Sequence, residues 1–350
     1  MVGIALLTLV PGELGGSESA TSSLLRTLAA QGTLPYCVYL PRIAEDASEG
    51  LPHAIVPEYL RARTIPGRLL AMLVAAARPG PLRRRLAGAD VVHYPLTIRI
   101  PPVPSPSVVT LHDLQHLDLP QLFSRGERLF RRVFWHRSVR DAQLVVTPSA
   151  FVRDRATALL GIDASRIRVI PHGIDHTRFA PGEGVQREEF LLYPARRWPH
   201  KNHETLFDAF ALLRAARPEL RLVLTGGGHS DDVPPGVEVR GHVSLDELVS
   251  LYRRAAAVVF PSLYEGFGQP VLEAMACGCP VACSAIPPLE EIAGDAARTF
   301  DPKNAESIAT AVSDVLTSPE EWRSEGLAQA RRYTWERAAT EYETVYRELL

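Results

Sequence analysis

The 350-residue sequence lacks several features that would define its class at once. It has no apolar run long enough to span a bilayer, because the longest candidate, Leu69 to Ala77, is too short. The apolar segment Gly3 to Val10 has no basic residues before it and runs into a glycine loop, so we expect a first strand rather than a signal sequence. No Asp-x-Asp pair of the kind that holds a metal ion is present, and no metal site is expected.

Cysteine is also scarce. There are four, of which Cys277, Cys279 and Cys283 form a C-x-C-x3-C cluster without a second group of ligands. Buried free thiols are therefore expected rather than zinc or disulfides. Such thiols indicate a cytoplasmic protein.

Lysine is missing from residues 1–175, which hold 20 arginines against 14 acidic residues, a balance of +6. The remainder carries 18 basic and 26 acidic residues, a balance of −8. The basic half indicates an anionic partner there, either a membrane surface or a phosphorylated acceptor. A hydrophobic content of 46% and the length of the chain predict a globular protein of two domains.

One stretch, 255–280, contains a strand, a loop and a helix. Ala255 to Phe260 is an apolar, β-branched run typical of a buried parallel strand. Pro270 suits the first position of a helix, and Gly278 followed by Pro280 suits its end. The helix is therefore expected to have about two turns.

This arrangement places Glu265 in the loop and Glu273 in the helix, on either side of amides that begin at Gly268. The start of a helix binds anions, but two carboxylates would repel a bare phosphate. A ligand with hydroxyls as well as phosphate would suit both the carboxylates and the amides. A dinucleotide fingerprint is a weaker interpretation, because Val271 stands where its third glycine should be, and two solvated glutamates are the structural alternative.

The segment EGFGQPVLE, residues 265–273, resembles the E-x7-E signature of retaining glycosyltransferases of the GT-B fold, especially glycosyltransferase family 4. The resemblance implies that Glu265 is catalytic and contacts the transferred sugar. It also implies that Glu273 binds the ribose of the nucleotide. The remaining contacts to the donor sugar would come from Gly266, Phe267 and Gly268.

Three further motifs occur in the order of that family. Gly15-Gly16 follows the first strand, and Gly16 would approach the donor diphosphate; a simple tight turn is the alternative. His112, in the element HDLQHL, resembles the catalytic histidine of members that transfer mannose or rhamnose, although a core histidine is possible. Arg196 and Lys201 resemble an R-x4-K clamp for the donor diphosphate, with a solvated basic loop as the alternative. Asn202 is expected to cap the helix that follows.

The resemblance covers nearly the whole chain and implies an α/β protein of the GT-B fold, two Rossmann-like parallel-sheet domains facing across a cleft. Residues 1–175 would bind the acceptor and 176–332 the nucleotide-sugar donor, while 333–350 would form a helix that packs back on the first domain.

The expected activity is a retaining, metal-independent glycosyltransferase without cofactors, in which the nucleotide diphosphate sugar is the donor substrate. Mannose or a deoxyhexose is the favoured sugar, and the hydroxyl acceptor would be a glycan, a lipid-linked glycan or a natural product. A non-catalytic nucleotide-sugar-binding subunit and a sugar-nucleotide epimerase of the same fold are the alternatives.

No nucleic-acid partner is expected. The apolar segment Gly67 to Arg78, with Arg83, Arg84 and Arg85 after it, is either an ordinary helix or a peripheral contact with the inner face of the membrane.

Overall fold

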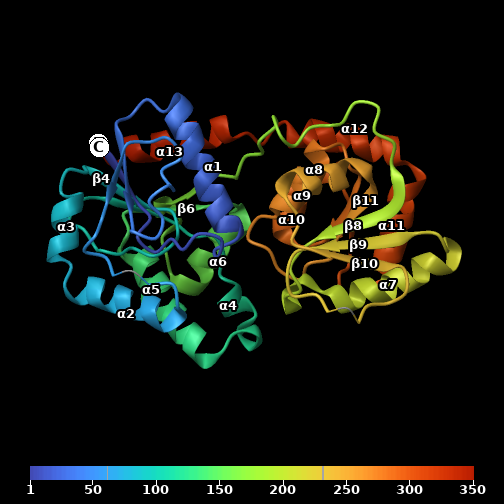
Figure 1. Cartoon of the computed structure of the whole chain (residues 1–350), viewed down its shortest axis with the longest axis horizontal. Helices are drawn as coiled ribbons and strands as arrows, with labels where there is room; N and C mark the ends of the chain where they lie inside the picture. Colours follow the sequence, from blue (N-terminus) through green and yellow to red (C-terminus); the bar gives the residue numbers. More distant parts are fainter. Residues whose placement is uncertain (61, 231) are drawn as a thin grey trace. The chain divides into compact units, whose positions relative to one another are not determined.

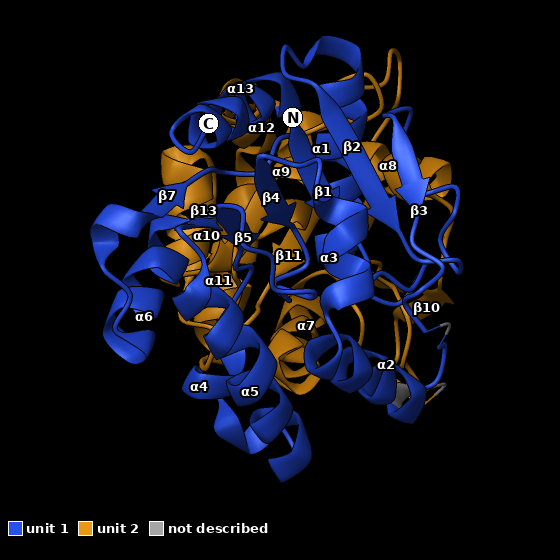
Figure 2. Cartoon of the chain, turned by 90° about the vertical axis from the view of Figure 1, so that its left-hand side faces the viewer, with its two compact units in different colours: residues 1–173, 335–350 blue, residues 174–334 orange. Residues whose placement is uncertain are grey.

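The computed structural model describes residues 1–60, 62–230 and 232–350 and divides into two compact units, coloured separately in Figure 2. Unit 1 comprises residues 1–173 and 335–350, and unit 2 comprises residues 174–334. Each unit is built on one sheet whose neighbouring strands all run parallel. Within the described residues, no helix is long and apolar enough to cross a membrane.

The sheet of unit 1 has seven strands in the order β3-β2-β1-β4-β5-β6-β7. The bounds of the strands are β1 (Val2–Ala5), β2 (Tyr36–Leu40), β3 (His53–Ile55), β4 (Val91–Tyr94), β5 (Ser107–Thr110), β6 (Leu144–Thr147) and β7 (Ile167–Val169). The chain builds outward from β1 in one direction and from β4 in the other. The position between β1 and β4 is therefore the topological switch point, where open α/β sheets bind their ligands.

Helices cover both faces of this sheet (Figure 1). On one face lie α1 (Gly16–Gln31) and α13 (Trp335–Arg347), which share a core with the inward side chains of β1 and β2. The other face is covered by α2 (Ile65–Ala77), α3 (Gly80–Leu86), α5 (Arg125–Asp141) and α6 (Ala150–Leu160). A single-turn helix, α4 (Gln115–Asp118), follows β5.

Unit 2 has six parallel strands in the order β10-β9-β8-β11-β12-β13. Their bounds are β8 (Glu188–Pro194), β9 (Arg221–Thr225), β10 (Val237–Gly241), β11 (Ala255–Phe260), β12 (Val281–Ser284) and β13 (Arg298–Phe300). The helices are α7 (His203–Ala216), α8 (Leu245–Arg254), α9 (Gln269–Ala276), α10 (Pro287–Ala293), α11 (Ala305–Thr317) and α12 (Pro319–Ala330). The switch point lies between β8 and β11.

The helix α13 is held on unit 1 by buried polar contacts as well as by apolar packing. The Glu343 carboxylate accepts hydrogen bonds from the Thr33 and Leu34 amides, the Thr33 hydroxyl and the Tyr36 hydroxyl. His93 on β4 lies 2.8 Å from both the Tyr346 hydroxyl and the Thr110 hydroxyl. Burial disfavours the ionised form of Glu343, but these hydrogen bonds outweigh it and lower its pKa to about 2.

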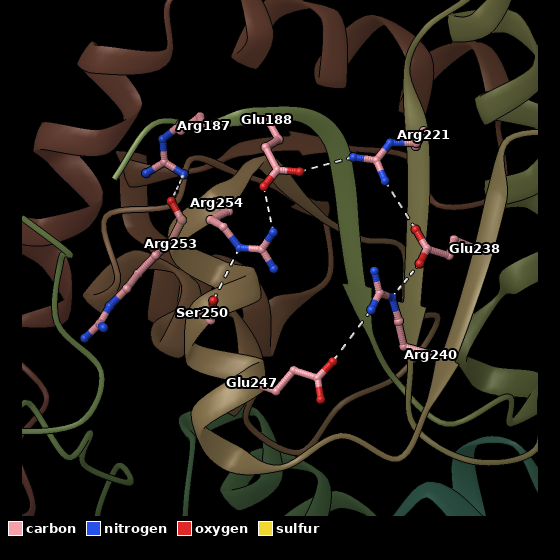
Figure 3. Close-up of polar contacts among 9 residues, drawn as sticks. All are labelled: Arg187, Glu188, Arg221, Glu238, Arg240, Glu247, Ser250, Arg253 and Arg254. Carbon is pink, nitrogen blue, oxygen red and sulfur yellow. Dashed lines mark hydrogen bonds and ion pairs between the residues drawn. The ribbon is translucent and has the colours of Figure 1, made fainter. Parts of the chain in front are cut away.

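Ion pairs join the strands of unit 2 near the amino-terminal end of β8 (Figure 3). Glu188 contacts Arg254 at 2.6 Å and Arg221 at 3.2 Å, and Arg221 reaches Glu238 on β10 at 3.3 Å. Arg240 continues the chain of contacts from Glu238 to α8. These side chains are mostly exposed, so each pair contributes little stability alone.

Candidate functional site

The residues of the expected R-x4-K motif and Glu265 follow β8 and β11, the two strands that flank the switch point of unit 2. Both segments leave the carboxyl ends of their strands, where parallel sheets bind polar ligands. The structure thus brings Lys201 and Glu265 together, although 64 positions separate them in the sequence.

Lys201 Nζ lies 2.5 Å from Glu265 Oε1. Their side chains are only 14% and 13% exposed, and Nζ also lies 5.1 Å from the centre of the Phe260 ring. Among the described residues each charge therefore has one ion-pair partner, and each side chain keeps a small opening to solvent. An incoming diphosphate could share the ammonium group, and an incoming hydroxyl could donate to the carboxylate.

Arg196 is partly buried beside Trp198, with its Cζ atom 5.7 Å from the centre of the indole ring. Within residues 1–60, 62–230 and 232–350 it forms no ion pair, whereas its neighbour Arg197 pairs with Glu204 at 2.7 Å. Arg196 is therefore the arginine of this loop that can offer its planar fork to an anion.

Asn202 occupies the cap position of α7, as expected, but it does not cap the helix through its side chain. Asn202 precedes the helix in a left-handed conformation (φ 62°), and its side chain makes no capping hydrogen bond. Its Nδ2 atom instead donates to the carbonyls of Pro261 (3.1 Å) and Pro302 (2.6 Å). The residue ties the loop after β8 to the loop after β11, which fixes Lys201 against Glu265.

The loop before α9 has a shape that only glycine permits at residue 268. Gly268 has φ +109°, and an added Cβ atom would lie 2.4 Å from Cδ2 of Leu289. The Phe267 side chain is buried and packs against the Tyr333 ring at 6.2 Å. Any contact of Phe267 with a sugar would therefore be made by its backbone. The helix has eight residues, about the two turns that the sequence predicted, and begins at Gln269, one residue before the expected first position at Pro270.

Glu273 lies on α9, and its Oε2 atom accepts a 2.9 Å hydrogen bond from the hydroxyl of Tyr252 on α8. Burial raises the pKa of Glu273 to about 7, although the Tyr252 hydrogen bond acts in the opposite direction. Sequence reasoning missed Tyr252, because nothing in the spacing of residues 252 and 273 indicates that they meet. The tyrosine leaves the other carboxylate oxygen for a second donor.

In unit 1, His112 follows β5, and its Nε2 atom lies 2.8 Å from the Pro95 carbonyl oxygen in the loop after β4. A carbonyl can only accept, so Nε2 carries the proton. Burial lowers the pKa of His112, while the Pro95 carbonyl and Asp113 oppose this effect. The neutral ring therefore presents Nδ1 as a hydrogen-bond acceptor, which suits a sugar hydroxyl.

The segment Pro171 to Asp175 resembles the PNGVD-type crossing between domains of family 4, with His172 in place of the asparagine. The His172 ring lies 6.0 Å from that of His112 and stacks on Trp335, the first residue of α13, at 5.8 Å. Burial and the nearby His112 lower the pKa of His172 to about 3. The swap therefore places a second neutral imidazole beside His112, which the sequence alone did not indicate.

Gly16 is the first residue of α1 and follows the loop after β1, beside the switch point of unit 1. Apart from its neighbours in the chain and the backbone of its own helix, no heavy atom of the described residues lies within 4 Å of the position that its Cβ would occupy. The Glu18 carboxylate accepts hydrogen bonds from the amides of Gly12 (2.8 Å) and Leu14 (3.2 Å). Sequence reasoning missed this role of Glu18, which fixes the loop from within the chain.

His116, the second histidine of HDLQHL, is buried, and its Nε2 atom lies 2.8 Å from Nε2 of His136 on α5. Across the described part of the chain, no group of three or more His, Cys, Asp or Glu side chains is arranged to hold a metal ion. All four cysteines are free thiols.

Two α/β units with all-parallel sheets, each with polar side chains after the strands that flank its switch point, define the GT-B class of fold. Residues 14–178 match the family model described as Glycosyltransferase Family 4, and residues 177–332 match the model described as Glycosyl transferases group 1. The chain belongs to the group 1 glycosyltransferases of family 4.

Relatives of known name agree with this assignment. O-antigen chain mannosyltransferase B of Escherichia coli is 30% identical over 284 residues, which cover 74% of this chain and 74% of that protein. O-antigen chain mannosyltransferase RfbU of Salmonella typhimurium is 28% identical over 220 residues, 61% of each chain. Among solved structures, sucrose-phosphate synthase of Thermosynechococcus elongatus superposes with a TM-score of 0.77 over 99% of this chain and 98% of that chain at 19% identity, which shows a shared fold.

Proposed function

We propose that this chain is a retaining, metal-independent glycosyltransferase that moves mannose or a deoxyhexose from a nucleotide diphosphate sugar to a hydroxyl of a glycan, a lipid-linked glycan or a natural product. The observation that carries the proposal is the contact of Lys201 with Glu265 at the switch point of unit 2, beside an arginine that has no ion pair among the described residues. The mannosyltransferase names of the relatives support mannose and a place in polysaccharide synthesis.

In this mechanism the difficult step is departure of the diphosphate while positive charge develops on the sugar ring. Arg196 and Lys201 would stabilise the charge that builds up on the leaving phosphate. Glu265 would accept hydrogen bonds from sugar hydroxyls and hold the ring in place, with the backbone from Gly266 to Gly268 beside it. Glu273 would accept from the ribose.

In unit 1, the neutral His112 would accept a hydrogen bond from a sugar hydroxyl through Nδ1, since its Nε2 proton is committed to Pro95. It therefore orients the sugar and does not serve as an acid at neutral pH. Gly16 would let the backbone approach the diphosphate. The chain is further proposed to work on the cytoplasmic face of a membrane as a peripheral protein.

The first test is thermal unfolding of the purified chain with GDP, UDP, dTDP and ADP in turn, with a chelator present. A nucleotide at about 100 times its dissociation constant adds about 2.7 kcal/mol of stability, which is a measurable shift of the unfolding midpoint. A shift with one nucleotide identifies the donor class. Failure of all four to raise the midpoint would contradict the donor site.

The second test is turnover with the sugar donor of the nucleotide that binds. Retention predicts that the new glycosidic bond has the anomeric configuration of the donor, as measured by proton NMR of the product. Metal independence predicts an unchanged rate with chelator. An inverted product or a rate that requires added Mg²⁺ would overturn the corresponding part of the proposal.

A further inference from the structure

The outer surface of α2 is apolar although no described part of unit 1 covers it. Leu70 and Leu73 are 58% and 55% exposed, and Val74 is also exposed. These residues and Ala77 follow the i, i+3, i+4, i+7 spacing of one helix face, while Ala71, Met72 and Ala75 face the core. A helix that is apolar on both faces normally has a partner on each, so the outer face indicates a binding surface.

The helix α5 covers the same face of the sheet as α2, and both lie at the lower margin of unit 1 in Figures 1 and 2. The exposed side of its first turns presents Leu129, which is 61% exposed, and Val133. Around them lie Arg125, Arg128 and Arg132, all exposed. In the part of the chain that the structure describes, none of these three arginines forms an ion pair.

The segment that contains these helices has a large excess of positive charge. Residues 61–140 contain 14 arginines, no lysine and four acidic residues, a balance of +10. The short helix α3 covers the same face of the sheet and carries Arg83, Arg84 and Arg85, of which Arg85 pairs with Glu58 at 2.8 Å and Arg83 donates to the Pro102 carbonyl oxygen at 2.6 Å. Sequence reasoning noted the apolar segment Gly67 to Arg78 and this last cluster, which is too small by itself to indicate a polybasic surface, but not the arginines of α5.

Apolar side chains between arginines suit the boundary between lipid headgroups and acyl chains. The leucines can enter the acyl region, and the arginine stems can extend along it while their guanidinium groups bind lipid phosphates. A second copy of the chain fits this surface less well, because a twofold contact would set two positive surfaces against each other.

We propose that the exposed faces of α2 and α5, with the arginines of α3, form a docking surface for a membrane that contains anionic phospholipid. This inference extends the membrane contact of the proposed function by naming its surface. It commits to lipid headgroups and acyl chains as the partner. The test below requires no glycosyl transfer, so its failure would leave the transferase proposal standing.

The experiment is co-sedimentation of the full chain with two kinds of vesicle, phosphatidylcholine alone and a mixture with phosphatidylglycerol. We expect binding to the mixed vesicles, weaker binding at high salt and little binding to phosphatidylcholine alone. Equal binding to both kinds, or no binding to either, would overturn the proposal.

Two double variants locate the surface. Leu70→Gln with Leu73→Gln removes apolar side chains but keeps good helix formers, and Arg128→Glu with Arg132→Glu reverses two charges. Each pair should weaken binding to the mixed vesicles by about tenfold or more. The matched controls lie in unit 2: Leu212→Gln, at a leucine that is 48% exposed on α7, and Arg331→Glu with Arg332→Glu, at two exposed arginines.

The controls should bind as the parent chain does. All variants should unfold within a few degrees of the parent, because the replaced side chains are exposed. Equal losses in the unit 2 controls would overturn the assignment to α2 and α5. Self-association by sedimentation velocity that disappears in the Leu70→Gln, Leu73→Gln variant would also overturn it, because the surface would then be an interface between copies of the chain.

Discussion

The ammonium group of Lys201 and the carboxylate of Glu265 contact each other at 2.5 Å across the ends of two neighbouring strands, with most of both side chains withdrawn from water. Each therefore neutralises the other in the absence of a ligand. Binding of a diphosphate and a sugar would give each group an additional partner, so the pair is suited to hold a charged, hydroxyl-rich ligand without large rearrangement.

Removal of either partner separates the structural role of this pair from its proposed chemical role. Lys201→Met or Glu265→Gln alone should cost about 2 kcal/mol of stability, because the remaining group loses its buried partner. Each should also lower turnover by about 100-fold or more. The double variant should regain most of the stability and none of the turnover, as measured by denaturant unfolding and initial rates. Recovery of turnover in the double variant would show that the pair only supports the fold.

The raised pKa of Glu273 predicts that nucleotide binding depends on pH. Its pKa is raised to about 7 by burial, and the ionised carboxylate accepts a stronger hydrogen bond from a ribose hydroxyl than the protonated group does. Affinity for the nucleotide should therefore rise by up to about tenfold between about pH 6 and pH 8, measured by calorimetry. Glu273→Gln should remove this dependence.

Tyr252→Phe tests the partner of that carboxylate. The tyrosine hydroxyl stabilises the ionised form of Glu273, so its loss should raise the pKa of Glu273 further. The increase in affinity for the nucleotide should then occur at higher pH. The variant should bind the nucleotide more weakly than the parent at neutral pH and about as tightly at alkaline pH. A binding curve that keeps its midpoint would show that Tyr252 does not act through Glu273.

Gly16→Ala tests the loop after β1. Because open space surrounds the position of the added Cβ atom, the substitution should leave the unfolding midpoint within a few degrees of the parent. If the backbone contacts the diphosphate there, the methyl group should weaken nucleotide binding by about tenfold or more. Gly80→Ala, which also places a Cβ atom in open space in unit 1, is the control. Equal affinity in both variants would remove Gly16 from the site.

The contacts of α13 predict how acid destabilises unit 1. Burial lowers the pKa of His93 to about 3, so the unfolded chain binds a proton that the folded chain excludes, and stability should fall as the pH drops below about 6.5. Glu343 has a pKa of about 2 in the folded chain, so its contribution is present above about pH 4.5 and is lost as the pH falls towards 2.

Thermal unfolding between pH 7 and pH 4 measures how these two groups change the stability of the chain with pH. His93→Gln should be less stable at neutral pH and should show a shallower loss in the upper part of that range. Glu343→Gln should cost about 2 kcal/mol at neutral pH, since four donors lose their charged acceptor. A pH profile unchanged by either substitution would contradict these assignments.

Sequence reasoning predicted the features that depend on local chemistry. The strand Ala255–Phe260 has the expected bounds, and the helix that carries Pro270 has the expected two turns although it begins one residue earlier, because apolar runs and proline act on neighbouring residues. The edge strand His53–Ile55 was missed because three partly exposed residues carry no periodic pattern. Asn202 is a residue type that often caps helices, but its side-chain amide donates to two carbonyls from distant loops and makes no capping hydrogen bond.

The tertiary contacts around the site could not be predicted in the same way. The family motif identified Glu265 and Lys201 as ligand-binding residues, but it did not predict that they would pair directly. The proton on Nε2 of His112 depends on a carbonyl in another loop, and the pKa of Glu273 depends on burial by several elements. Such properties follow from packing, which a linear pattern does not record.

The division of the chain also has a consequence for its synthesis. Unit 2 is one continuous segment, whereas the core of unit 1 includes Trp335, Tyr342 and Tyr346 from a helix that is translated after all of unit 2. Domains tend to fold as units during translation. Unit 1 is therefore the first to be synthesised in part, but it can complete its core only after unit 2. Until residues 335–350 emerge, the apolar side chains of α1 and β2 lack their packing against α13, and we expect the nascent chain to have most need of a chaperone during that interval.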